Sequence, residues 1–329
     1  KAVNEMLGSL AEDAGIRRED VFQVCVVGNT CMHHLFLGIS PASLVHAPYT
    51  PAVSERLVLN AGDYGLAVQE RAELIMLSDI AGYVGADTCG CLLAIRQDQQ
   101  EEISLMIDIG TNGEMVLGNR ERMVTCSTAA GPAFEGAKIE CGMRGAAGAV
   151  DHVKYEDGKW NYTTVGNKPA VGLCGSGLID LVAGLLDAGM LDENGVLRSG
   201  QEKQGVFILV LPERGGNERG VYLTQKDLGE VQLAKAAIAA GIQMLMERIG
   251  ITEDDICSVY IAGAFGNYMD PVSAGKIGLF PATLVKKVKP VGNAAGEGAK
   301  IALVNEKEML DMDELVRKIE FVELAASPE

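Results

Sequence analysis

The sequence predicts an α/β protein, and three observations support this class. Forty of its 329 residues are glycine, and only 5% are aromatic. Glycine permits tight turns between strands and helices, and small side chains let helices pack closely on sheets. Apolar runs of strand length also alternate with segments of helical periodicity. The length of the chain allows two lobes.

The first hundred residues predict helices and strands in alternation. In chain order, the predicted elements are a helix at 3–15, a strand at 21–27, a helix at about 31–38 and a strand–loop–helix unit at 74–95. Residues 40–73 are predicted to be irregular, because three prolines in this segment forbid a long helix. The polar stretch 96–102 has the composition of a linker.

A β-meander follows, made of ISLMIDIG, GEMVLGN and RMVTCS, and a helix is predicted over AFEGAKIECG (133–142). Three strands followed by a helix resemble a ribonuclease-H-like lobe. Further predicted elements are a strand, a Gly-Ser-Gly turn and a helix within 168–191, a helix at 226–251, a strand at 258–270 that ends in a glycine turn, and a helix within 292–304.

These patterns predict three parts of the chain. Residues 1–102 form a partial first lobe, 103–304 form a second lobe with a nucleotide site, and 305–329 form a helix and strand that return to the body.

Charge and hydropathy exclude two classes of partner. The formal net charge of −17 repels a phosphodiester backbone, so nucleic acid is not expected to bind. No apolar run approaches the roughly 18 to 20 residues of a membrane-spanning helix, and the N-terminal residues carry acids where a signal peptide is apolar. A cytoplasmic protein is expected.

The eight cysteines are scattered through apolar or glycine-rich segments, which predicts reduced and mostly buried thiols. Only Cys89 and Cys91 lie close in sequence, and no C-x2-C pair offers a zinc or iron–sulfur site.

Asp108 ends the first meander strand, directly before the turn Gly110-Thr111-Asn112-Gly113. Backbone N–H groups of such a turn can point at an anion, but the carboxylate repels phosphate unless a divalent cation lies between them. The pairing therefore indicates a magnesium nucleotide. An ordinary hairpin with Asp and Gly as turn formers explains the same residues equally well.

Similar glycine turns follow other apolar strands, at Gly175–Gly177, at Gly263–Gly266 and at Gly292. A nucleotide in a cleft needs close backbone approach from several strand ends, which glycine allows. The recurrence favours the nucleotide interpretation.

The order of these motifs resembles the ATPase superfamily of acetate and sugar kinases, Hsp70 and actin, with two ribonuclease-H-like lobes. The resemblance is closer to the C-terminal ATPase domain of reductive activators of corrinoid proteins. It covers residues 3 to 326 and is carried by VGNTCMHHLFLGISPASLVHAPYTP, DIGTNGEMVLGN, CSTAAGPAFEGAKIECGMRGAAGAV, LCGSGLIDLVAGLLDAG, LTQKDLGEVQLAKAAIAAGI and IAGAFGNYMDP.

The resemblance implies specific roles. The phosphate loop of the family is matched by Asp108, Gly110, Thr111, Asn112 and Gly113. The resemblance implies that Asp108 would hold magnesium through water. Gly263, Ala264, Phe265 and Gly266 match the adenosine loop, and Gly292 and Asn293 match a connecting segment. Gln232 and Lys235 stand where related ATPases contact adenine or ribose, although a solvated lysine is an equal explanation.

Three further residues have open assignments. Asp87 is a candidate for orienting the attacking water or the magnesium shell, and a helix N-cap explains it equally well. Ser127 and Thr128 offer hydroxyls toward a corrinoid partner or a phosphate. For Thr128 a structural role is preferred, and for Ser127 both stay open.

Two features of the family have no counterpart in these residues. The first acidic phosphate loop, a strand ending in Asp-Ile-Gly-Thr-Thr, is missing, so the first lobe is expected to be truncated at its N-terminus. The iron–sulfur domain is missing too, so this chain is expected to carry no cluster and to transfer no electrons itself.

The function implied by the resemblance is ATP- and magnesium-dependent return of a corrinoid protein from Co(II) to Co(I), in a methyltransferase or O-demethylase system. The expected partner is the corrinoid protein, and a homodimer is expected from the family. Two alternatives stay open: a small-molecule kinase or hydantoinase-like ATPase of the same superfamily, and a non-catalytic partner-binding module.

Overall fold

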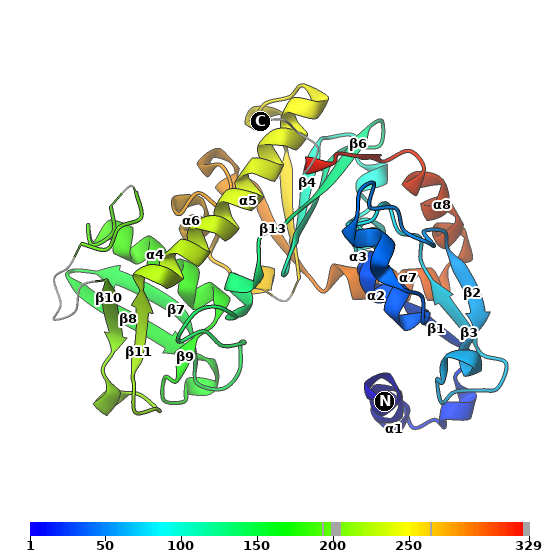
Figure 1. The fold of residues 1–329 in the computed structure, drawn as a ribbon, viewed down its shortest axis with the longest axis horizontal. Coiled ribbons are helices and arrows are strands. Elements are labelled where there is room, and N and C mark those ends of the chain that lie inside the picture. The colour runs from blue at the N-terminus through cyan, green and yellow to red at the C-terminus, as the bar shows by residue number, and fades with distance from the viewer. Residues whose placement is uncertain (193, 199–204, 264, 325–329) are drawn as a thin grey trace. The chain divides into compact units, whose positions relative to one another are not determined.

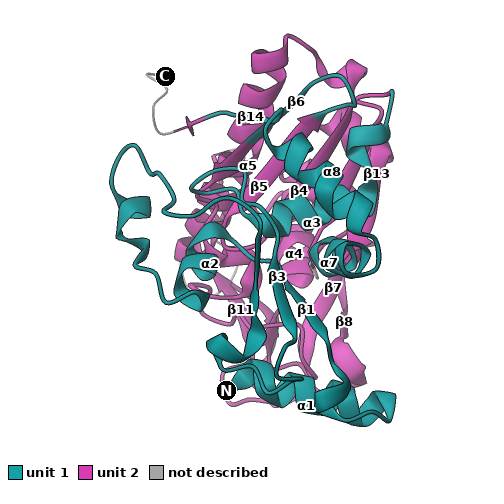
Figure 2. Ribbon diagram, turned by 90° about the vertical axis from the view of Figure 1, so that its right-hand side faces the viewer, with its two compact units in different colours: residues 1–101, 118–125, 293–322 teal, residues 102–117, 126–292, 323–329 magenta. Residues whose placement is uncertain are grey.

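A computed structural model of the chain describes residues 1–192, 194–198, 205–263 and 265–324 (Figure 1). Contacts between residues divide it into two compact units (Figure 2). Unit 1 contains residues 1–101, 118–125 and 293–322, and unit 2 contains residues 102–117 and 126–292 with residues 323 and 324. Both units combine helices with strands, which confirms the predicted α/β class.

The elements of unit 1 are α1 (Ala2–Ala14), β1 (Gln23–Val26), α2 (Thr30–Phe36), β2 (Leu57–Asn60), β3 (Glu73–Met76), α3 (Ala86–Ile95), α7 (Ala294–Val304), α8 (Glu306–Val316) and β14 (Glu320–Phe321). A three-stranded sheet has the order β1–β3–β2, with β1 parallel and β2 antiparallel to β3. Leu74 and Met76 of β3 are fully buried and form a core with Ala61 and Ala72.

Helices α3 and α7 of unit 1 touch backbone to backbone. A Cβ built on Gly298 would lie 1.9 Å from the carbonyl oxygen of Gly90, and one built on Gly90 would lie 2.6 Å from the carbonyl oxygen of Ala295. Both distances are far below van der Waals contact. Only glycine fits at these two positions, because a methyl group on either helix would push the backbones apart.

Helix α8 is held to the rest of unit 1 by polar contacts. Asp313 accepts hydrogen bonds from Ser78 Oγ and from Arg56 Nε, each at 2.8 Å. Glu308 forms an ion pair with Arg96, the residue that follows α3. These contacts join segments more than 200 residues apart in sequence.

The elements of unit 2 are β4 (Ser104–Ile109), β5 (Gly113–Gly118), β6 (Met123–Thr128), β7 (Ala149–Glu156), β8 (Lys159–Thr164), β9 (Gly172–Leu173), α4 (Gly175–Asp187), β10 (Val206–Val210), β11 (Val221–Thr224), α5 (Gln225–Ile249), β12 (Ser258–Ala262), α6 (Pro271–Lys276) and β13 (Val288–Gly292). The strand order in the main sheet is β13–β12–β4–β5–β6. The tip of the β5–β6 hairpin, residues 118–125, belongs to unit 1, where β14 pairs with β6.

Helix α5 is the longest described helix, and its ends follow from local sequence. Thr224 accepts a hydrogen bond from the backbone N–H of Asp227, whose side chain bonds back to Thr224. Gly250 ends the helix in the left-handed conformation. At Gly241 the helix packs closely on the sheet, since a Cβ there would lie 2.5 Å from Met115 Cε.

Two smaller sheets complete unit 2, one with the order β8–β7–β9 and one formed by β10 and β11. Their aromatic side chains pack together: the ring of Trp160 lies 4.8 Å from that of Tyr155 and 4.9 Å from that of Phe207, centre to centre. Such aromatic pairs stabilise packing beyond their buried area.

Most predicted helices and strands are confirmed, including the meander and the helices at 3–15 and 226–251. Two expectations were wrong. Residues 133–142 form no α-helix, only a 3-10 turn at Pro132–Glu135, because Gly136 adopts a left-handed φ of 81°. The segment 40–73, predicted to be irregular, contributes strand β2.

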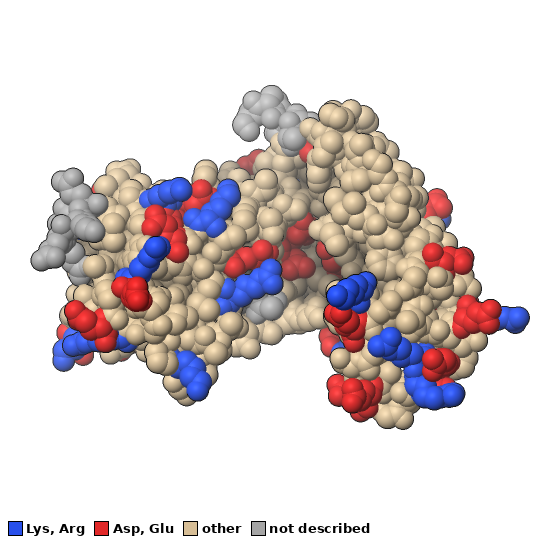
Figure 3. All heavy atoms as spheres, turned by 60° about the horizontal axis from the view of Figure 1, so that its bottom comes forward, with Lys and Arg blue, Asp and Glu red and all other residues tan. Residues whose placement is uncertain are grey.

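Among the described residues, no helix combines the length and hydropathy needed to cross a membrane. On the face drawn in Figure 3, Lys and Arg side chains lie interspersed with Asp and Glu and form no single basic patch.

The backbone contact between α3 and α7 gives a stability prediction. We expect Gly298→Ala to lower the free energy of unfolding by about 3 kcal/mol, because overpacking against a backbone cannot relax through a rotamer change. Gly229→Ala is the matched control: nothing lies within 4 Å of a Cβ at this position in α5, so about 1 kcal/mol of stabilisation is expected. Urea unfolding followed by circular dichroism measures both. Equal stability of the two variants would refute the close contact.

Candidate functional site

Asp108 lies where three parallel strand ends of unit 2 converge. Strands β4 and β12 are parallel, and Asp108 is paired with Ala262, the last residue of β12. The next residue, Gly263, has a φ of 90°, and a Cβ there would lie 3.0 Å from Asp108 Oδ1. The Gly263 N–H donates to the Gly292 carbonyl at the end of β13, at 2.9 Å. The structure thus brings Asp108, Gly263 and Gly292 together.

The turn after Asp108 is closed by its own backbone. Gly110 N–H donates to the carbonyl of Asn112 at 2.9 Å. Thr111 is exposed, and Asn112 is half-buried. Gly113 has no room for a side chain, since a Cβ would lie 2.8 Å from Thr128 Oγ1. Thr111 lies at the surface of this closed turn, where its hydroxyl can reach a ligand.

Two hydroxyls fasten the segment 126–136 to the end of this turn and to the start of β5. Thr128 Oγ1 donates to the Gly113 carbonyl and Ser127 Oγ donates to Glu114 Oε1, each at 3.2 Å. Thr128 is 4% exposed, so its hydroxyl supports the turn from inside. Ser127 is half-buried. A role of Ser127 toward a corrinoid partner stays a prediction.

The predicted adenosine loop, residues 263–266, is described in part. Ala264 lies outside the described residues. Phe265 and Gly266 belong to a 3-10 turn, in which the Gly266 N–H donates to the Gly263 carbonyl at 3.2 Å. The amide of Asn267 lies against Gly292, since a Cβ there would be 3.1 Å from Asn267 Nδ2. Close packing of this loop on the end of β13 requires glycine at position 292.

Gln232 and Lys235 are both half-buried on α5, and each reaches a neighbouring loop. Gln232 Nε2 donates to the carbonyl of Asn194 at 3.1 Å. Lys235 Nζ lies beside Gly278, where a Cβ would be 3.2 Å away. Their predicted contacts with a nucleoside stay predictions.

Asp87 and Asn293 belong to unit 1. Asn293 Oδ1 accepts from the Gly296 N–H at 3.1 Å, so its side chain caps α7. Asp87 lies in the first turn of α3, and its Oδ1 accepts from the Thr88 N–H at 2.9 Å. Burial raises the pKa of the Asp87 carboxyl above its ordinary value. The N-cap of α3 is Gly85, so the helix-cap explanation for Asp87 was wrong.

A buried His–Asp pair instead supports the start of α3, and sequence reasoning missed it. Asp79 accepts from the Ala86 N–H at 2.9 Å, and His33 Nδ1 lies 3.2 Å from its carboxylate. Both side chains are less than 10% exposed. Burial raises the pKa of Asp79 despite the hydrogen bond from His33. The sequence signal was an acid, Asp79, three residues after the apolar strand β3.

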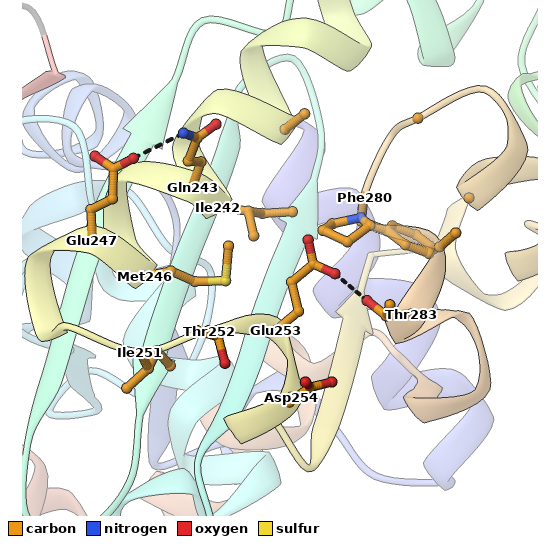
Figure 4. A pocket seen from close by; sticks show the side chains of 15 residues that line it. Ile242, Gln243, Met246, Glu247, Ile251, Thr252, Glu253, Asp254, Phe280 and Thr283 are labelled. Carbon is orange, nitrogen blue, oxygen red and sulfur yellow. Dashed lines mark hydrogen bonds between the residues drawn. The ribbon is translucent and has the colours of Figure 1, made fainter.

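A pocket of about 740 Å³ in unit 2 is lined by none of the predicted site residues (Figure 4). Apolar side chains such as Ile242, Met246 and Phe280 line it together with Glu247 and Glu253, which bond to Gln243 and Thr283 respectively. No Lys or Arg is among its lining residues, so it does not suit a polyphosphate.

The thiols form no described metal centre. In the part of the chain that the structure describes, no three His, Cys, Asp or Glu side chains are grouped to hold a metal ion. None of the eight cysteines, all of which the structure describes, forms a disulfide. Burial raises the pKa of Cys25 to about 11 and that of Cys126 to about 12, which keeps both thiols protonated near neutral pH. Cys31 and Cys257 are exposed.

Two family models match the chain. The model of the C-terminal domain of RACo, the ASKHA domain, matches residues 102–329, and that of the RACo middle region matches residues 1–100. The actin-like fold class implied by the sequence resemblance is thereby confirmed.

Characterised relatives agree with this match. "Corrinoid activation enzyme RamQ" of Eubacterium limosum is 35% identical over 339 residues, covering 98% of this chain and 57% of the relative. A Co(II) methylated amine-specific corrinoid protein reductase of Methanosarcina barkeri is 30% identical over 278 residues, covering 78% of this chain and 49% of the relative.

The solved structure of a "Reductive activator for corrinoid,iron-sulfur protein" superposes with a TM-score of 0.89 at 37% identity, covering 98% of this chain and 53% of that one. The chain therefore spans about half the length of the relatives it matches.

Thiol burial predicts a pattern of alkylation. With iodoacetamide at pH 8 under reducing conditions, we expect Cys31 and Cys257 to react at least ten times faster than Cys126. The thiolate is the reactive form, and a pKa of about 12 leaves roughly one Cys126 in ten thousand ionised at this pH. Peptide mass spectrometry over time measures each site. All eight cysteines should react in 6 M guanidinium, and rapid native labelling of Cys126 would contradict its burial.

Proposed function

We propose a function for this chain, which belongs to the RACo family, from the geometry at Asp108. Unit 2 binds ATP with magnesium, and the bound nucleotide assists the return of a corrinoid protein from Co(II) to Co(I) in a methyltransferase or O-demethylase system. The one electron for this reduction comes from a separate low-potential electron donor. The observation that carries the proposal is the placement of the Asp108 carboxylate beside Gly263, at the ends of strands β4 and β12.

The residues present suit a magnesium nucleotide. A carboxylate is a ligand that Mg²⁺ prefers, directly or through water, and phosphates fill the rest of its shell. The backbone at Gly263 is free of a side chain, so a phosphate or sugar can approach it closely. Thr111 adds an exposed hydroxyl donor. In α/β folds ligands bind at the carboxyl ends of parallel strands, where this group lies.

Assignments beyond this group are finer proposals. Gln232 and Lys235 contact the nucleoside, and Gly266 and Gly292 give it close backbone approach. Asp87 orients the attacking water; this assignment rests on its motif and on the burial that makes its carboxyl more basic. Asn293 already caps α7, which supports a structural role beside any role in binding.

Nucleotide binding can assist a difficult reduction only through a difference in affinity. A ligand shifts an equilibrium by the ratio of its affinities for the two states, and by nothing else. We propose that the ATP-bound form of the chain binds the corrinoid protein in the state that is reduced more readily. Segment 126–136, bonded to the phosphate turn through Ser127 and Thr128, is our candidate for this contact.

The first test is direct binding. Isothermal titration of the chain with ATP and excess MgCl2 should give saturable heat. Asp108→Asn should weaken the affinity at least tenfold, because the amide removes the charge that faces the cation. Asp157→Asn is the matched control: it makes the same charge change at an exposed turn where φ is 51°, which suits asparagine. Equal affinity of both variants would reject the site, and absence of heat would favour a non-catalytic module.

The second test concerns the partner. ATP hydrolysis by the chain should accelerate several-fold when a Co(II) corrinoid protein is added, and the same protein stripped of its corrinoid should have a smaller effect. Phosphate release measured under anaerobic conditions follows both reactions. Rapid phosphorylation of a small alcohol or carboxylate without any protein partner would instead identify a kinase.

A further inference from the structure

Glu135 places a carboxylate in front of the phosphate turn. Thr111 Oγ1 donates a hydrogen bond to Glu135 Oε1 at 3.0 Å, and both side chains are exposed. A Cβ on Gly110 would lie 3.7 Å from the same oxygen. The hydroxyl that the turn offers to a phosphate is therefore held by a negatively charged group.

The backbone around Glu135 is fixed, so this carboxylate has a defined origin. Ala133 and Phe134 before it are buried. Gly136 after it has a φ of 81°, and a Cβ there would lie 2.5 Å from the backbone nitrogen of Met143. The same segment is bonded to the turn through Thr128. Only the side chain of Glu135 is free to change its direction.

Within the described residues, Glu135 forms no ion pair. Its hydrogen-bond donor is the neutral hydroxyl of Thr111. Free ATP carries about four negative charges near neutral pH, and magnesium removes two of them. Repulsion between Glu135 and a phosphate is therefore much larger for the free anion than for the magnesium complex.

We propose that Glu135 makes the phosphate turn selective for a metal-bound triphosphate, by excluding the free polyanion from Thr111. This inference rests on the proposed nucleotide function and adds a specificity-determining residue to it. Both carboxylates then repel a phosphate that arrives without a cation, and Asp108 in addition attracts the cation.

The test is a comparison of dissociation constants for ATP measured by isothermal titration, once with excess MgCl2 and once with EDTA. The wild-type chain should bind the magnesium complex at least a hundredfold more tightly than free ATP. Glu135→Gln keeps an oxygen acceptor for Thr111 but removes the charge. It should strengthen binding of free ATP at least tenfold and change binding of the magnesium complex less than threefold.

Glu213→Gln is the matched control, because Glu213 is an exposed glutamate of unit 2 that is remote in sequence from the turn. It should leave both constants unchanged. Asp108→Asn should lower the same ratio but is told apart by at least tenfold weaker binding of the magnesium complex, which Glu135→Gln leaves nearly unchanged. Thermal unfolding of each variant confirms that it is folded.

The outcomes separate the two proposals. If the wild-type chain binds magnesium ATP but Glu135→Gln leaves the ratio of the two constants unchanged, the selectivity role is wrong and the nucleotide function stands. If Glu213→Gln shifts the ratio as much as Glu135→Gln does, the effect is one of overall charge and the inference fails. If the wild-type chain binds no ATP under either condition, both proposals fall.

Discussion

The candidate site depends on the close approach of two strand ends in unit 2, which places Asp108 beside Gly263. Strand β12 ends one residue before Gly263, and the carboxylate of Asp108 fills the space that a side chain there would need. A glycine with positive φ is the only residue that satisfies both constraints. The acid on β4 and the glycine after β12 therefore have to be understood as a pair, although they lie 155 residues apart in sequence.

A second level of organisation surrounds this pair. The turn at 110–113 is bonded to segment 126–136 on its inner side through Thr128 and on its outer side through Thr111 and Glu135. A buried neutral hydrogen bond and an exposed charged one thus connect the same two segments. The buried bond fixes the geometry, and the exposed one can exchange with a ligand at small energetic cost because both of its groups regain water.

The sequence predicted elements with strong periodicity, and it predicted Asp108 because an acid at the end of an apolar strand is conspicuous. It failed where tertiary contacts overrule local pattern. Residues 133–142 have helical composition, but the packing of Gly136 on Met143 ends the turn early. The pairing of His33 with Asp79 joins residues that are 46 apart in sequence, so no local sequence pattern predicts it. Hairpin β7–β8 was missed although the sequence carries its signal: Asp157-Gly158 forms the two-residue turn, and Trp160 and Tyr162 alternate with polar residues in β8.

The crossing of α3 and α7 at Gly90 and Gly298 has a consequence for how this protein can vary. Two backbones in direct contact have no rotamers to adjust, so their mutual position is set by main-chain shape alone. Neighbouring side chains on both helices can then be exchanged without moving the axes. A larger residue at either position would shift both helices at once. Substitution at each of these two glycines is therefore restricted by the other helix.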